Sequence, residues 1–302
     1  MQSLLQPVVD ILGPWEFSPT VLLACGGSAL LYVRGLQRAG GDGRSPRFWR
    51  NTAFFIGLAS VYAFLQTHLD YLSQHMFWVH RLQHLVLHHA APFLIALAAP
   101  LEVMAQGTPD WLRRRVFVPL FRNPLTLGLY RLIQNPVIAP LLFTGLIGFW
   151  LIPSIHFKAM LSLARYDLMN WSMLIDGLLF WWLIVGPEKH TGIKQLGYGT
   201  RIIMLWAIML PQIAIGAYIT LSSSVLYTSY SVCGRAWPIA PITDQNIGGL
   251  ITWIPAAMMS AVGALVVLRR WRNDNQAEPV TPRAGPLVVS PGKKLAMEET
   301  CR

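Results

Sequence analysis

Histidines are concentrated in one short stretch of the chain, HMFWVHRLQHLVLHH at positions 75–89, which holds five of the eight. Three of them, His80, His84 and His88, follow at intervals of four residues, so in an α-helix their rings project from one face. Met76 lies one helical turn before His80. Imidazole binds copper, zinc and iron, and thioether sulfur favours Cu(I). The pattern therefore predicts a soft metal site, best suited to copper as Cu(I), with these candidate ligands: Met76, His80, His84, His75 and His88.

A carboxylate, Asp176, stands in the otherwise apolar stretch NWSMLIDGLLFWW at 170–182. In a membrane segment such a group is protonated, paired or turned toward a polar interior. It is a further candidate metal ligand, and it can also hold a histidine in one tautomer or link two helices as a neutral carboxyl. The histidines keep a structural alternative as well, because buried imidazoles also join helices through hydrogen bonds.

The elements that must position these residues are membrane helices. The 302 residues are 54% hydrophobic and 13% charged, with a mean hydropathy of +0.44, whereas a soluble domain carries about 25% charged residues. A helix needs about 20 mostly apolar residues to cross the hydrocarbon core. The sequence therefore predicts an all-α, polytopic membrane protein, a bundle of seven transmembrane helices near residues 18–35, 50–67, 76–98, 133–152, 168–186, 200–221 and 247–268.

Basic residues predict the orientation of this bundle. Most of the 24 Lys and Arg fall in the connections and the tail on one side, and the exceptions are Arg81, Lys158, Arg165 and Arg235. This asymmetry places the N-terminus outside and the C-terminus in the cytoplasm, and it accounts for the net charge of +10 without nucleic acid as a partner. The first residues lack a basic start, so we expect no cleaved secretory leader.

The chain is predicted to hold one membrane domain at 1–272 and a tail at 273–302, which is rich in Pro, Gly and charge and is expected to be disordered. Structural roles are predicted at the start of the last span, in DQNIGGLITWIP. Asp244 is expected to cap that helix at its N-terminus. Gly248 and Gly249 are expected to allow close packing of neighbouring helices.

Three stretches resemble the CtaG family of bacterial inner-membrane proteins, the cytochrome c oxidase assembly factors. They are HRLQHLVLHHAAPFLIALAAP, RLIQNPVIAPLLFTGLIGFWLIP and RIIMLWAIMLPQIAIGAYIT, the last followed by Tyr227, Tyr230 and DQNIGGLITWIP. The resemblance covers about residues 50–272. The Asp-Gln-x-x-Gly-Gly string is its most specific part, since short apolar runs match by chance.

The resemblance implies a seven-helix, multi-pass protein of the bacterial inner membrane that is not an enzyme. It implies a role in assembling a haem–copper oxidase, at the stage of copper insertion or subunit maturation. The expected partners are an oxidase subunit during assembly and the surrounding membrane lipid. The family-matched polar positions are His80, Gln83 and His84.

The chain departs from the family pattern in two places. The family usually places Met directly after the first histidine of the pair, where this chain has Arg81. A basic residue there repels a cation unless its side chain extends away toward the interface. The family often carries histidines ahead of GLLFWW, where this chain has Tyr166, Asp167 and Asn170.

Other functions fit the same residues. A copper or proton-coupled transporter would use Asp176 and the histidines as a path through the membrane. The strings HRLQH and HLVLHH also resemble the histidine boxes of membrane di-iron enzymes, although those need boxes on several helices. A bis-histidine haem protein needs partners on facing helices, and His68 and His88 are expected to differ too much in depth.

Overall fold

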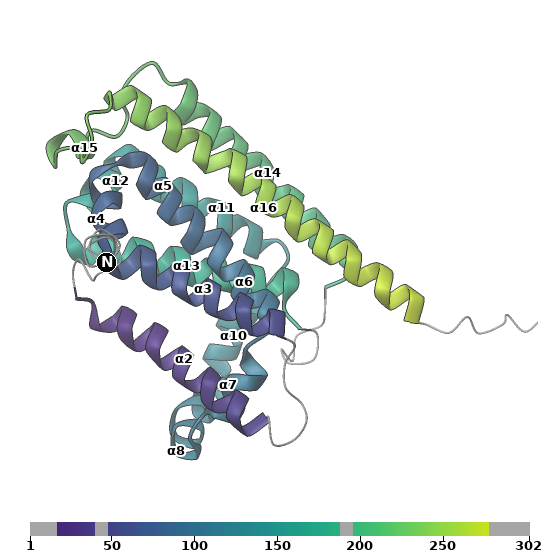
Figure 1. Cartoon of the computed structure of the whole chain (residues 1–302). Helices are drawn as coiled ribbons and strands as arrows, with labels where there is room; N and C mark the ends of the chain where they lie inside the picture. Colours follow the sequence, from purple (N-terminus) through teal and green to yellow (C-terminus); the bar gives the residue numbers. More distant parts are fainter. Residues whose placement is uncertain (1–16, 40–47, 188–195, 278–302) are drawn as a thin grey trace, which may run out of the picture.

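The computed structural model describes residues 17–39, 48–187 and 196–277, and within these ranges the chain is helical with no β-strand (Figure 1). The elements are α2 Pro19–Ala39, α3 Phe48–Gln66, α4 His68–His75, α5 Phe77–Leu85, the π-helix η2 Val86–Ala90, α6 Ala91–Ala98, α7 Leu101–Gly107, α8 Asp110–Leu112, the π-helix η3 Arg113–Phe117, α9 Val118–Arg122, α10 Pro124–Ile133, α11 Ile138–Leu151, α12 Pro153–Met160, α13 Leu163–Val185, α14 Tyr198–Leu221, α15 Ser229–Val232 and α16 Pro241–Ala277. The all-α prediction is confirmed for these residues.

Four single helices are long and apolar enough to cross a membrane: α2, α13, α14 and α16. Two bent pairs raise the number to six if each forms one span. The first pair is Phe77–Ala98 with Leu101–Gly107, bent by 69°, and the second is Pro124–Ile133 with Ile138–Leu151, bent by 77°. These helices fit the predicted membrane protein. Seven spans and the orientation of the ends stay predictions.

The predicted second span, 50–67, coincides with α3, which has 19 residues. It is not among the candidate spans, because Arg50, Asn51 and Gln66 lower the hydropathy of an otherwise apolar helix. At the other end of the chain, α16 continues through Ala277, past the end predicted for the last span. The rest of the predicted tail lies outside the described residues.

Small residues let α16 pack closely on two neighbours, and α14 and α16 run side by side in Figure 1. A Cβ atom on Gly248 would overlap the ring of Phe77 in α5. A Cβ atom on Gly249 would overlap the side chain of Thr220 in α14. The prediction that these two glycines permit close helix packing is therefore confirmed.

Asp244 caps a different helix from the one predicted. α16 already begins at Pro241, and the Asp244 carboxylate accepts hydrogen bonds from the backbone N–H of Phe77 (3.2 Å) and Trp78 (2.9 Å), the first residues of α5. It also pairs with Arg235, with Nε 3.2 Å from Oδ2. The predicted cap on its own helix is wrong, because the N-terminus of α5 lies opposite and its free N–H groups attract the carboxylate.

The predicted third span, 76–98, is not one regular helix. It consists of α5, the π-helix η2 and α6, and the backbone N–H of Ala91 bonds to the carbonyl of Val86, five residues earlier. A Cβ atom on Gly177 of α13 would collide with the carbonyl of His88 in η2. The π-helix therefore lies against α13 at backbone distance, and π-helical turns of this kind are frequent at functional sites.

Candidate functional site

Three buried imidazoles meet in the interior of the bundle. The ring centroids of His80 and His84, both on α5, are 4.3 Å apart, as their spacing predicts. His156 of α12 approaches edge-on, with its ring centroid 5.1 Å from that of His80. All three are buried. His156 could not be predicted from the sequence, because a single histidine in a short apolar segment carries no spacing pattern.

Both ring nitrogens of His84 are engaged. Nδ1 lies 3.2 Å from Arg81 Nη1, and Nε2 lies 3.2 Å from Asn170 Oδ1. A guanidinium only donates hydrogen bonds, so Nδ1 accepts. In a neutral ring Nε2 then carries the hydrogen and donates to the amide oxygen. The lone pair that a metal would need is therefore occupied by Arg81.

His156 is held in a similar way. Its Nδ1 lies 3.1 Å from the carbonyl oxygen of Trp150, to which it donates, and its Nε2 accepts from the Tyr230 hydroxyl at 3.0 Å. Burial, with a smaller effect from the positive Arg81 nearby, lowers the pKa of His156 to about 3. The ring is therefore neutral at physiological pH, with its one lone-pair nitrogen bonded to Tyr230.

His80 differs from both neighbours, since neither of its ring nitrogens has a hydrogen-bond partner. The side chain is fully buried, and a buried polar group without a partner costs about 1–3 kcal/mol. Such a group is a natural attachment point for a ligand. No three His, Cys, Asp or Glu side chains in the described ranges are placed to hold a metal ion together. In addition, Arg81 and Tyr230 already occupy the lone pairs of His84 and His156.

Two of the remaining predicted ligands, His75 and His88, bond to groups outside this cluster. His75 ends α4, where its Nδ1 lies 2.8 Å from the carbonyl oxygen of Tyr71 and its ring packs on the Tyr71 ring at 4.1 Å. Met76 is fully buried at the junction of α4 and α5. His88, in η2, pairs with Asp176, with Nε2 2.9 Å from Oδ2. The structure thus brings His80 together with His84, and separately His88 together with Asp176. The second pair agrees with the alternative in which Asp176 holds a histidine in one tautomer.

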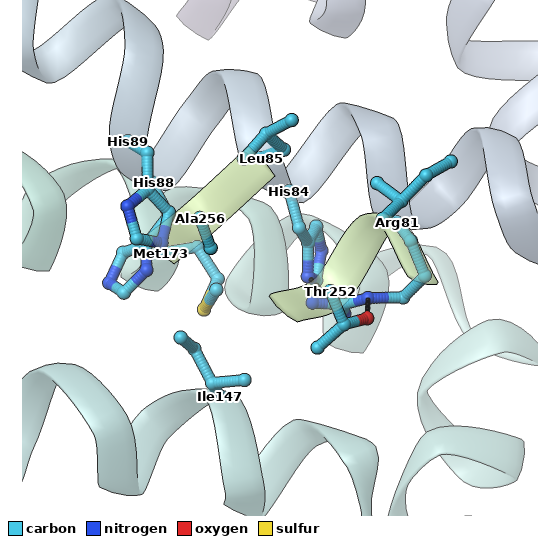
Figure 2. Close-up of a pocket in the computed structure, with 10 residues that line it drawn as sticks. Arg81, His84, Leu85, His88, His89, Ile147, Met173, Thr252 and Ala256 are labelled. Carbon is cyan, nitrogen blue, oxygen red and sulfur yellow. Dashed lines mark hydrogen bonds between the residues drawn. The ribbon is translucent and has the colours of Figure 1, made fainter. Parts of the chain in front are cut away.

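A small cavity adjoins these groups (Figure 2). Its polar lining comes from Arg81, His84, His88, His89 and Thr252, and its apolar lining includes Met173. Figure 2 shows the Met173 side chain extending toward Ile147 on the other side of the cavity. Met173 is a thioether that the sequence analysis did not single out, because it belongs to α13 and has no local relation to the histidine stretch.

Arg81 is the unusual member of this lining. Its side chain is 4% exposed. Its Nε donates to the Thr252 hydroxyl at 2.9 Å, besides the bond of Nη1 to His84. No carboxylate in the described part of the chain forms an ion pair with it. A buried cation in a membrane bundle is expensive and marks functional positions.

A second polar network links α4, α5 and α13 beside the histidine cluster. The Asp70 carboxylate accepts from Gln83 Nε2 (2.9 Å), from the Tyr166 hydroxyl (2.8 Å) and from Gln74 Nε2 (3.0 Å). Gln83 is one of the family-matched polar positions, and Tyr166 is one of the departures. Burial raises the pKa of Asp70 to about 6, even though these three donors act in the opposite direction.

Asp70→Asn should change how stability depends on pH. With the pKa of Asp70 at about 6 in the folded state and 3.8 ordinarily, the folded protein holds the proton more tightly than the unfolded chain. The protonated Asp70 side chain therefore adds to the free energy of unfolding at low pH, and this contribution is lost as the pH rises from about 4 to about 6. Melting temperatures in detergent micelles should therefore favour the Asn variant increasingly across this window and by a constant margin above it. Asp110→Asn, at an exposed position, is the control, and a constant difference between wild type and Asp70→Asn would contradict the prediction.

Two mycobacterial proteins are similar to this chain. The uncharacterized protein Mb0105 of Mycobacterium bovis is 25% identical over 283 residues, which cover 89% of this chain and 41% of that protein. The uncharacterized protein MT0111 of Mycobacterium tuberculosis matches with the same identity and coverage. This chain thus spans about two fifths of the length of these relatives. No solved structure matches it.

The family comparison agrees with the resemblance seen in the histidine, Trp-x-x-Pro and Asp-Gln-x-x-Gly-Gly stretches. The model of the cytochrome c oxidase caa3 assembly factor family matches residues 30–274, which is most of the chain and includes every residue that lines the cavity. The protein belongs to the family of cytochrome c oxidase caa3 assembly factors.

Proposed function

We propose that this protein supports the assembly of cytochrome c oxidase by holding Cu(I) between His80 and His84 and passing it to a maturing oxidase subunit. Membership in an assembly factor family points to a non-catalytic role with oxidase subunits as partners. The proposed location is the bacterial inner membrane, with the N-terminus outside, following the distribution of Lys and Arg.

The state of His80 is the main observation that supports copper binding. Both of its ring nitrogens lack partners although the side chain is fully buried. Its ring lies 4.3 Å from that of His84. Two adjacent imidazoles suit copper, and a thioether would add preference for Cu(I). Met76 and Met173 are both buried candidates for that third ligand.

Arg81 makes this a site that must open before it binds. The His84 Nδ1 lone pair becomes available only when the Arg81 guanidinium releases it. Copper binding is therefore coupled to a movement of Arg81 away from His84. Such coupling suits a protein that hands its cargo on, because a return of Arg81 to His84 would compete with the metal.

Anaerobic Cu(I) titration of the purified protein against a chromophoric chelator tests this function. Wild type is expected to bind one more Cu(I) than His80→Ala/His84→Ala. The matched control is His68→Ala/His75→Ala, which removes two histidines from the neighbouring α4. Melting temperatures would establish that both double variants are folded. Equal stoichiometry in wild type and His80→Ala/His84→Ala would refute the proposed copper site.

A further inference from the structure

Residues 109–133 form a helical segment that the rest of the molecule does not cover. It comprises α8, η3, α9 and α10, and none of its residues is buried. We call it the basic arm. In Figure 1 the label α8 marks the arm where it projects from the edge of the bundle beside α2 and α7. A helical segment without a fully buried residue gains little from packing on the bundle, so we expect another environment to stabilise it.

The side chains of the basic arm belong to two classes. Five are arginines, and Asp110 is the single acidic residue in this stretch of the sequence. The others include large apolar groups that are highly exposed, among them Trp111 (63%), Phe121 (63%) and Leu125 (81%). Arginine together with Trp, Phe and Leu on exposed helices is the composition of segments that lie in a membrane interface. The arginines are Arg113, Arg114, Arg115, Arg122 and Arg131.

The path of the chain leads the basic arm sideways from the candidate spans. Before the arm, α7 is bent by 69° from the helical segment Phe77–Ala98. At its far end, α10 is bent by 77° from α11. If Phe77–Ala98 and α11 cross the membrane, their continuations α7 and α10 run close to the membrane plane. The arm follows α7 and ends with α10, so both its ends are tied to the surface.

We infer that the basic arm lies along the membrane interface and binds anionic phospholipids. Its arginines contact the headgroup phosphates, and Trp111, Phe121 and Leu125 enter the boundary with the acyl chains. The charge of the arm favours anionic phospholipid, because the arm contains five arginines and only one aspartate. An anionic leaflet attracts basic segments of this kind. The tethering at both ends favours it too, since the arm remains beside lipid at all times.

A fluorescent reporter on the full-length protein tests this inference. An environment-sensitive dye is attached at Phe121→Cys in a chain that also carries Cys233→Ser and Cys301→Ser, while the buried Cys25 is retained. The protein is placed in nanodiscs of phosphatidylcholine alone or mixed with phosphatidylglycerol. We expect blue-shifted emission and quenching by spin-labelled lipid, both stronger with phosphatidylglycerol. Each arginine near an anionic surface strengthens attachment about fivefold, so Arg113→Glu/Arg115→Glu should weaken it by roughly 30-fold or more.

Lys158→Glu/Arg165→Glu is the matched control, because it reverses two exposed basic residues outside the arm. It should leave the emission and the quenching unchanged. A dye that stays in water in both lipid mixtures would overturn the inference. So would a dye that becomes shielded only after an oxidase subunit is added, since the arm would then be a protein-docking element. The comparison between the two lipids, made on the labelled chain with all five arginines in place, decides the matter without relying on a charge-reversal variant.

Discussion

Arg81→Met is expected to raise the affinity of the protein for Cu(I) by about 10- to 100-fold. In the wild type, the guanidinium occupies the His84 Nδ1 lone pair at 3.2 Å and places a buried positive charge beside the proposed site. A hydrogen bond to a charged group contributes about 1.5–3 kcal/mol, which corresponds to this range. Methionine removes the charge, frees the lone pair and adds a thioether, a ligand that favours Cu(I). Competition with a Cu(I) chelator under anaerobic conditions measures the change.

Two further variants separate the causes of this effect. Arg81→Lys keeps the buried charge, so its affinity should stay near that of the wild type. Arg122→Met removes an exposed arginine from the basic arm and should also have no effect. An affinity of Arg81→Met no higher than that of the wild type would mean that Arg81 does not compete with copper at His84. A gain that persists in Arg81→Met/His84→Ala would place the metal elsewhere.

Asp244→Ala is expected to lower the free energy of unfolding by about 2–4 kcal/mol. The carboxylate is fully buried and holds three partners: the N–H groups of Phe77 and Trp78 at the start of α5, and the Arg235 side chain. Alanine leaves the buried N–H of Phe77 and the partly buried N–H of Trp78 unpaired, and it leaves Arg235 without its counter-charge. The first turn of α5, which runs from Phe77 to His80, should also become more mobile. Thermal denaturation in detergent micelles, with circular dichroism as the readout, measures the loss.

Asp110→Ala provides the comparison for this substitution. Asp110 is also the first-turn carboxylate of a helix, but it is exposed, and surface substitutions of this kind usually change stability by less than about 0.5 kcal/mol. Asp244→Asn should fall between the two, because the amide oxygen still accepts one N–H bond while the charge is lost. A melting temperature of Asp244→Ala equal to that of Asp110→Ala would show that the cap contributes no stability.

The parts of the site that sequence could predict are those set by local periodicity or by the resemblance. His80 and His84 are neighbours because a spacing of four residues brings side chains together on any α-helix. The packing roles of Gly248 and Gly249 followed from their size alone. Membership in the assembly factor family followed from strings too specific to match by chance.

The parts that sequence could not predict depend on contacts between distant segments. His156, Asn170 and Met173 reach the histidines from α12 and α13, and nothing in their own neighbourhoods indicates it. Asp244 has the local context of a cap for its own helix, but its carboxylate bonds to α5. Tertiary packing decides which helix N-terminus the Asp244 carboxylate caps. The residues next to Asp244 in the sequence hold no information about that packing.

The π-helix η2 contains His88 and follows the α-helical segment that carries His80 and His84, so it sets how His88 is rotated about the helix axis relative to those two histidines. A π-helical turn accommodates one more residue than the α-helical turn it replaces, and one residue corresponds to about 100° of rotation. Removing a single residue between Val86 and Ala90 would convert η2 into regular α-helix. Because the wider π turn takes up the rotation of that one residue, everything after it would keep its direction relative to His80 and His84. A natural relative lacking that residue would therefore keep α6 against the same neighbouring helices, and its chain would align with this one with a gap of one residue inside the histidine stretch.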